Sequence, residues 1–166
     1  ISTLCLGQHY GLSTRLLDWT QNPLIALWFA LNHAEIESTL KNKDCTVWLL
    51  GFNKSDILSP KMNLKLKDIA RTQILYPHIN DKRISAQSSI FTIHKIDTKT
   101  GRFVEIENNR LYKTNLKRIE IDKDHKHLVQ QELSLYLSKQ MIFQDLASLC
   151  DDINTKNENE FDLLYL

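Results

Sequence analysis

Polar and ring-bearing side chains crowd residues 7–22, directly before an almost wholly apolar segment that begins at Pro23. A polar group that is buried costs free energy unless it is paired, so a segment that served packing alone would hold fewer of them. The pattern therefore predicts a ligand site. Its candidate residues are His9, Tyr10, Thr14, Arg15, Asp18, Trp19 and Asn22.

The types of these side chains favour an anionic ligand that carries a flat ring. A helix that begins at Asn22 directs free N–H groups and a partial positive charge toward the candidate residues, which favours a phosphate. Arg15 can bind the same phosphate through two hydrogen bonds. The rings of Tyr10, Trp19 or His9 can stack on a base.

A second polar cluster covers residues 83–94, RISAQSSIFTIH. Gln87 lies just before a predicted strand, where its amide can orient a ribose hydroxyl or a nucleophile. Together the two clusters suit a nucleotide, provided that they meet in space. The sequence contains no glycine-rich phosphate motif and no GxSxG pattern. It also contains no HExxH pattern, no CxxC pair and no run of carboxylates that resembles a calcium loop, so no metal is predicted.

Each candidate also has a purely structural explanation. Arg15 and Asp18 can form an ion pair that only holds the turn. Trp19 can be a core residue, Gln87 can cap the turn before its strand, and His94 can be a buried histidine of the fold. The concentration of polar groups before Pro23 is what favours a site.

Composition sets the class of protein. The chain has 166 residues, 42% hydrophobic and 25% charged residues, and a net charge of +1, which suits one globular domain. This balance makes nucleic acid an improbable partner and gives no argument for a membrane. The longest apolar run, 23–31, is too short to span a bilayer. Three well-separated cysteines predict buried thiols in a reducing, cytoplasmic compartment.

The periodicity predicts an α+β fold with a small mixed or antiparallel sheet, a central apolar helix after Pro23 and two C-terminal helices. Asp124 is expected to cap the first of these two helices. Strands are expected over 45–52, which reads as an interior strand, and over 89–96, which reads as half-buried, as well as over 103–106 and 116–121. The C-terminal helices are expected over 125–139 and 142–153.

The segment QHYGLSTRLLDWTQNPLIALWFA closely resembles the signature of FRG domains, with Ser13 where proline is common. Residues 76–94, YPHINDKRISAQSSIFTIH, are similar to a later element of that family, an arginine followed by AQxGxFTxH. Residues 141–153 resemble its C-terminal element, with Gln144 in place of proline. The resemblance implies one FRG-type domain over 1–153 and a polar tail over 154–166.

The resemblance also carries expectations about function. The Phe-Arg-Gly motif that names the family is not in this sequence and is expected upstream of Ile1. FRG domains are prokaryotic and phage-associated and occur in toxin-like or defence contexts. They are distantly similar to ADP-ribosyltransferases, which implies NAD as a substrate and no prosthetic group. In this comparison with ADP-ribosyltransferases, Gln87 takes the place of the catalytic carboxylate. Tyr10 or Thr14 takes the place of the middle one of the three sequence elements that such enzymes use.

Three hypotheses follow. The first is an ADP-ribosyltransferase, which transfers ADP-ribose to a macromolecule, or an NAD glycohydrolase. In this enzyme Gln87 orients the reacting sugar, and His9 or Asp18 orients the neighbouring side chains or carries a proton. The second is a non-enzymatic module that recognises a protein or a nucleotide. The third is a metal-independent nuclease in which His9 and His94 are acid and base and Arg15 binds the phosphate.

Overall fold

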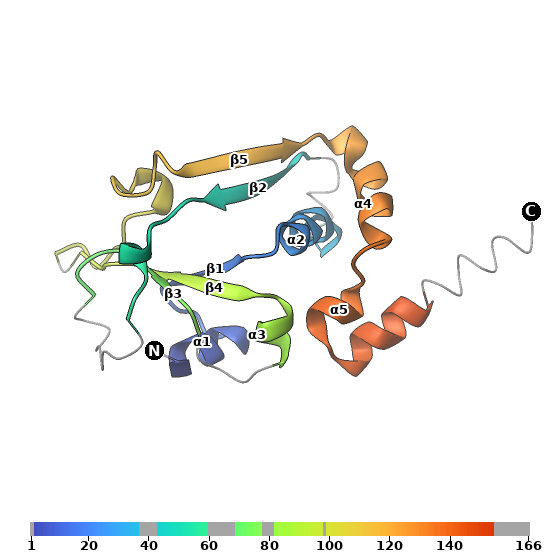
Figure 1. Cartoon of the computed structure of the whole chain (residues 1–166), viewed down its shortest axis with the longest axis horizontal. Coiled ribbons are helices and arrows are strands. Elements are labelled where there is room, and N and C mark those ends of the chain that lie inside the picture. The colour runs from blue at the N-terminus through green and yellow to red at the C-terminus, as the bar shows by residue number, and fades with distance from the viewer. Residues whose placement is uncertain (1, 37–42, 60–68, 78–81, 98, 155–166) are drawn as a thin grey trace, which may run out of the picture.

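The computed structural model describes residues 2–36, 43–59, 69–77, 82–97 and 99–154 (Figure 1). The strands of this part of the chain form two antiparallel sheets rather than one. The first sheet has the order β1-β4-β3, and the second pairs β2 with β5. The bounds are β1 Leu16–Thr20, β2 Cys45–Leu50, β3 Gln73–Leu75, β4 Ser89–Ile93 and β5 Leu116–Ile121.

Helices pack against the two sheets, and the predicted α+β class is confirmed. In Figure 1, α2 lies between the levels of the two sheets and beside α4, whereas α1 and α3 lie on the far side of the β1-β4-β3 sheet. The helices are α1 Ser2–His9, α2 Pro23–Ile36, α3 Lys82–Ala86, α4 Lys126–Ser134, α5 Lys139–Phe143 and a last one over 146–154. Short 3-10 turns are η2 Lys54–Asp56, η4 Ile106–Asn108 and η5 Lys123–His125.

The helix predicted from Pro23 is confirmed as α2. Asn22 caps it, because the Asn22 Oδ1 atom accepts a hydrogen bond from the backbone N–H of Leu24 at 3.0 Å. Proline suits the first helical position because that residue needs no N–H donor. The helix buries Ile25 and Leu31, which are 2% and 3% exposed. Its apolar sequence is therefore used for packing between the sheets and α4.

Two groups of buried side chains hold the fold together. One lies under the β1-β4-β3 sheet and joins α1 to it, and the other joins α2, β2 and α4. The first contains Cys5, Leu16, Leu58, Ile69, Leu75, Phe91 and Ile93, and the second contains Leu31, Cys45 and Leu133. Because β4 is the middle strand, all its residues from 90 to 93 are buried, and the expectation of a half-buried strand is wrong.

Several local expectations need correction. The strand β2 is not interior, since it pairs only with β5 in the described part of the chain and leaves Trp48 48% exposed. No strand forms over 103–106. There Phe103 makes a single bridge with Ile96, and η4 follows. Cys150 is exposed, whereas the other two thiols are buried as expected.

The C-terminal helices are shorter than predicted. The helix α4 ends at Ser134, and Gln144 separates α5 from the last helix because its φ of 53° is left-handed. Asp124 does not cap α4, whose N-cap position is held by His125 without a side-chain hydrogen bond. Asp122 instead caps the preceding turn η5, where its side chain accepts a hydrogen bond from the backbone N–H of Asp124. Local capping therefore places each helix boundary a few residues from the periodic pattern.

An ion pair between η2 and the segment before β3 gives a testable pH dependence. The backbone N–H of Asn53 and the guanidinium of Arg71, at 2.7 Å, both stabilise ionised Asp56 and lower its pKa below the ordinary 3.8. A lowered folded pKa contributes stability above the ordinary value, and this stability is lost as the pH falls through the folded value. We expect Asp56→Asn to lower the free energy of unfolding by about 1 kcal/mol at pH 7, because Arg71 is partly exposed.

At pH 3 the difference between Asp56→Asn and the wild type should shrink toward zero. Urea unfolding at the two pH values measures it. An equal loss of stability at both pH values would show that the carboxylate charge contributes nothing.

Candidate functional site

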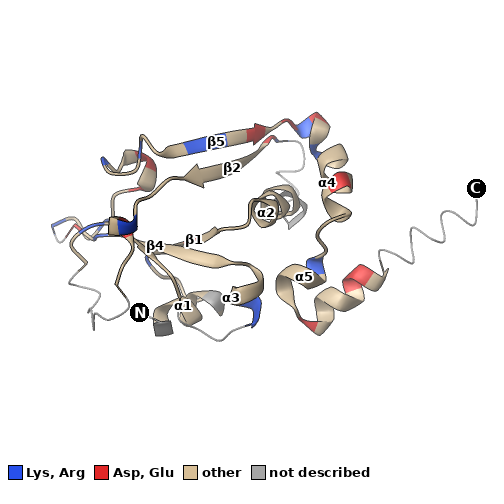
Figure 2. Ribbon diagram, in the orientation of Figure 1, with Lys and Arg blue, Asp and Glu red and all other residues tan. Residues whose placement is uncertain are grey.

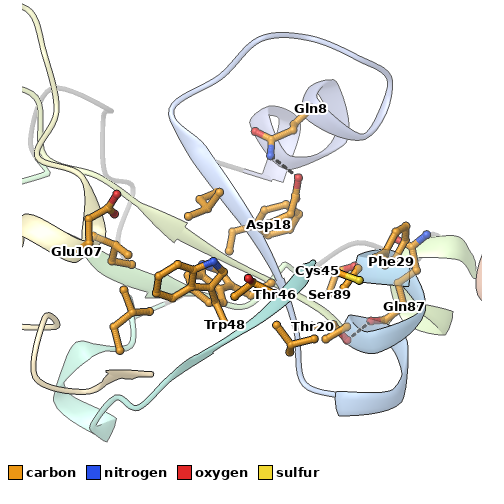
Figure 3. A pocket seen from close by; sticks show the side chains of 18 of the residues that line it. Gln8, Asp18, Thr20, Phe29, Cys45, Thr46, Trp48, Gln87, Ser89 and Glu107 are labelled. Carbon is orange, nitrogen blue, oxygen red and sulfur yellow. Dashed lines mark hydrogen bonds between the residues drawn. The ribbon is translucent and has the colours of Figure 1, made fainter. Parts of the chain in front are cut away.

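A cavity of about 960 Å³ lies between β1 and β2 (Figure 3). Four consecutive residues of each strand, 17–20 of β1 and 45–48 of β2, contribute to its wall. Because neighbouring side chains of a strand point to opposite faces, the cavity must follow the strand edges rather than one face. In the described part of the chain β1 pairs only with β4 and β2 only with β5, so each strand turns an unpaired edge toward the cavity.

The two polar clusters of the sequence share this cavity. Asp18, Trp19 and Thr20 line it from the first cluster, and Gln87 and Ser89 line it from the second. They meet because β1 pairs with β4, which places Thr20 opposite Ser89. The Thr20 hydroxyl also donates a hydrogen bond to the backbone carbonyl oxygen of Gln87 at 2.7 Å, drawn as a dashed line in Figure 3.

A hydrogen-bond chain orients the Asp18 carboxylate. The Gln8 Nε2 atom donates to Asp18 Oδ2 at 2.7 Å, and the Thr14 hydroxyl donates to Gln8 Oε1. Thr14 in turn accepts a hydrogen bond from the Leu16 N–H at 3.0 Å. Since Thr14 takes the carbonyl oxygen of the Gln8 amide, its nitrogen faces Asp18. Gln8 lines the cavity; it belongs to the crowded polar segment of the sequence, but no role was predicted for it.

Buried side chains at the end of β4 hold Trp19 in place. Its indole Nε1–H donates to Thr92 Oγ1 at 3.2 Å, and this oxygen lies 3.1 Å from His94 Nε2. Burial lowers the pKa of His94, which favours the neutral ring that can accept the Thr92 proton. His94 is only 3% exposed and does not line the cavity, so its structural interpretation is favoured over a role as acid or base.

The other candidates lie away from the cavity wall. Tyr10 is 76% exposed in the turn after α1, and Arg15 precedes β1, where burial lowers the pKa of its guanidinium. Asn22 caps α2 through the N–H of Leu24, and it does not line the cavity, so the predicted role of the helix start in binding a phosphate stays a prediction. His9 ends α1, and its side chain lies outside the described part of the structure.

Charged and aromatic side chains outside the two clusters complete the cavity. Figure 3 shows Glu107 and Trp48 toward one end, and Cys45, Phe29 and Gln87 toward the other. Glu107 comes from η4, and Trp48 comes from β2. No sequence motif points to Glu107 or Trp48. They reach the cavity only through the pairing of β2 with β5 and the position of the turn η4.

Basic side chains line the end that contains Cys45 and Gln87. Arg83 precedes Gln87 by one turn of α3, and its guanidinium also lies 4.5 Å from the centre of the Phe143 ring. Lys126 begins α4. Figure 2 shows basic positions at the start of α3 and at the turn into α4. The cavity therefore has a basic end and, with Asp18 and Glu107, an acidic remainder.

The described residues hold no group of three potential metal-ligating side chains. In the same part of the chain, no helix has the length and apolar character needed to cross a membrane.

Comparison with known proteins finds a similarity to one family over the first part of the chain. The model of the FRG domain matches residues 1–39, which contain α1, β1 and α2. No curated protein and no solved structure matches the chain, and nothing in these comparisons supports the distant similarity to ADP-ribosyltransferases. The match does not extend to Gln87, so only its position beside the cavity supports a role for the second polar cluster in the site. Residues 1–39 of the chain are therefore similar to an FRG domain.

Proposed function

We propose that this chain binds a nucleotide of the NAD class in the cavity between β1 and β2 and cleaves its nicotinamide–ribose bond. The product is either free ADP-ribose or ADP-ribose transferred to a macromolecule. The observation that carries this proposal is the meeting of Asp18, Gln87, Trp48 and basic side chains in one cavity. The toxin or defence role implied by the family resemblance would rest on this activity.

The size and the walls of the cavity suit a dinucleotide. A volume of about 960 Å³ lies at the upper end of small-molecule sites. Trp48 presents a half-exposed indole face, and Trp19 is held in place through Thr92. Stacking of a base or a nicotinamide ring on such a side chain contributes about 1–3 kcal/mol per ring.

The charges orient the ligand. NAD carries negative phosphates and a positively charged nicotinamide ring. The phosphates are favoured at the basic end, near Arg83, and the nicotinamide is favoured near Asp18 and Glu107. The scissile bond then lies beside the hydrogen-bonded carboxylate.

The chemistry needs few groups. When the C–N bond breaks, its electron pair goes to the nicotinamide nitrogen and the ribose becomes an oxocarbenium-like cation. The Asp18 carboxylate, fixed by Gln8, can stabilise that positive charge. Gln87 cannot act as a base, but its amide can orient a ribose hydroxyl. Water or an acceptor hydroxyl then forms the new C–O bond and loses its proton to solvent.

Nicotinamide release from NAD by this chain, with NAD binding followed by thermal shift, tests the proposal. We expect Gln87→Ala to lower kcat by about 10- to 100-fold, since it removes an orienting hydrogen bond. Gln131→Ala on the exposed side of α4 is the matched control and should have wild-type activity. The proposal is wrong if the wild type neither releases nicotinamide nor gains thermal stability with NAD.

The unpaired strand edges favour a second candidate function, recognition of an extended peptide. A peptide strand laid along β1 or β2 would bond to backbone groups that have no strand partner in the described residues. This module would bind without turnover. Hydrogen exchange separates the two functions, because a peptide would protect the amides of residues 17–20 or 45–48, whereas NAD would act mainly through side chains.

A further inference from the structure

Lys126 occupies an unusual position at the basic end of the cavity. It lines the cavity, yet its Nζ atom is shielded from solvent and has no hydrogen-bond partner among the residues that the structure describes. An ammonium group removed from water without a partner is unfavourable. A side chain kept in this state is explained most simply by a negatively charged ligand that pairs with it.

The elements around Lys126 hold its backbone in place. The Asp44 carboxylate accepts a hydrogen bond from the Lys123 N–H at 2.9 Å, which ties the turn before α4 to the start of β2. One turn along α4, Gln130 donates to Asn32 of α2 at 3.1 Å. Lys126 therefore begins a helix that is anchored to α2 and to the start of β2, both of which line the cavity, while its flexible stem lets the ammonium group turn toward a ligand.

We propose that this end of the cavity is an anion subsite in which Lys126 binds a phosphate group of the ligand. The inference rests on the proposed nucleotide function and names the residue that recognises the phosphate. The charged side chains that line this end are Lys43, Asp44, Arg83 and Lys126, three of them basic. Three positive side chains against one negative side chain give this end a balance of charge that favours an anion.

This subsite differs from the phosphate site that the sequence suggested at Arg15 and the start of α2. Arg15 does not line the cavity, and the N–H of Leu24 at the start of α2 is bonded to Asn22. Lys126 lies more than 100 residues from either and belongs to no motif of the first polar cluster. Only the packing of α4 against α2 and β2 brings it to the same cavity as Asp18.

The test compares ligands that differ only in phosphate, by calorimetric titration of ADP, adenosine and inorganic pyrophosphate. We expect the wild type to bind ADP about 10- to 100-fold more tightly than adenosine, as expected for a charge-assisted hydrogen bond. In Lys126→Met this preference should fall to within about threefold, with adenosine affinity unchanged. Lys126→Arg should keep the preference. Lys123→Met, which removes an exposed lysine from the same turn, is the control.

A second readout needs no ligand. Because Lys126→Met removes an unpaired buried charge, the melting temperature of the free protein should rise, whereas Lys123→Met should leave it unchanged. An unchanged preference for ADP in Lys126→Met, or no binding of ADP and pyrophosphate to the wild type, would overturn the subsite. Binding of pyrophosphate that depends on Lys126, with no binding of NAD, would keep the subsite and overturn the proposed NAD function.

Discussion

Replacing Phe91 with alanine is expected to lower the free energy of unfolding by about 3–5 kcal/mol, as is usual when a buried phenylalanine is truncated. Phe91 is 3% exposed in the middle strand β4 and belongs to the core that joins α1 to the sheet. It also lines the cavity and lies opposite Asp18 in the strand register. The same side chain thus supports both the core and the wall that carries the carboxylate.

Thermal or urea unfolding of Phe91→Ala measures the first effect, and calorimetric titration with NAD measures the second. Where the variant folds, ligand affinity should fall as well, because the void beneath β1 lets the strand move. Leu135→Ala, which truncates a 79% exposed leucine after α4, is the control and should change stability by less than about 0.5 kcal/mol. A loss below about 1 kcal/mol for Phe91→Ala would mean that this core does not hold the sheet together.

The parts of the fold that depend on local signals could be predicted from the sequence. The helix α2 was predicted because Asn22 and Pro23 give a start signal and the following residues are apolar. The strand β5, Leu116–Ile121, was predicted within its observed bounds from its period of two. In both cases the signal lies within the element itself.

The elements that depend on distant partners could not be predicted in this way. The strand β1 was missed because LLDWT contains a charged residue and has a mixed burial pattern, and its partner β4 lies some 70 residues away. The division of the strands into two sheets is a property of pairing, which periodicity does not encode. For this reason the free edges that border the cavity were not foreseen.

The candidate site was predicted in part. Asp18, Trp19 and Gln87 line the cavity, and their roles remain predictions. Other polar residues of the first cluster, such as Thr14, mainly orient their neighbours, which is the structural alternative for a crowded polar segment. Glu107 joins the cavity from a separate turn, and a single sequence contains no signal for that encounter.

Asp18→Asn is expected to have the largest effect on activity, a fall in kcat for nicotinamide release of about 10²- to 10³-fold. The carboxylate faces positive charge that develops only as the C–N bond breaks, so its loss should act on kcat more than on KM. Asparagine has nearly the same shape, and its carbonyl oxygen can still accept the hydrogen bond from Gln8. The free energy of unfolding should therefore change by less than about 1 kcal/mol.

Two further variants decide whether the effect belongs to Asp18 itself. Glu107→Gln removes the other carboxylate from the acidic part of the cavity, and Asp97→Asn removes an exposed carboxylate from the β4–η4 connection. We expect Asp97→Asn to have wild-type kinetics, and Glu107→Gln to raise KM for NAD without a large change in kcat, since Glu107 faces the nicotinamide side of the cavity. If Glu107→Gln instead abolishes release while Asp18→Asn is active, the catalytic carboxylate is Glu107, and the hydrogen-bond chain from Thr14 through Gln8 serves the fold of the loop alone.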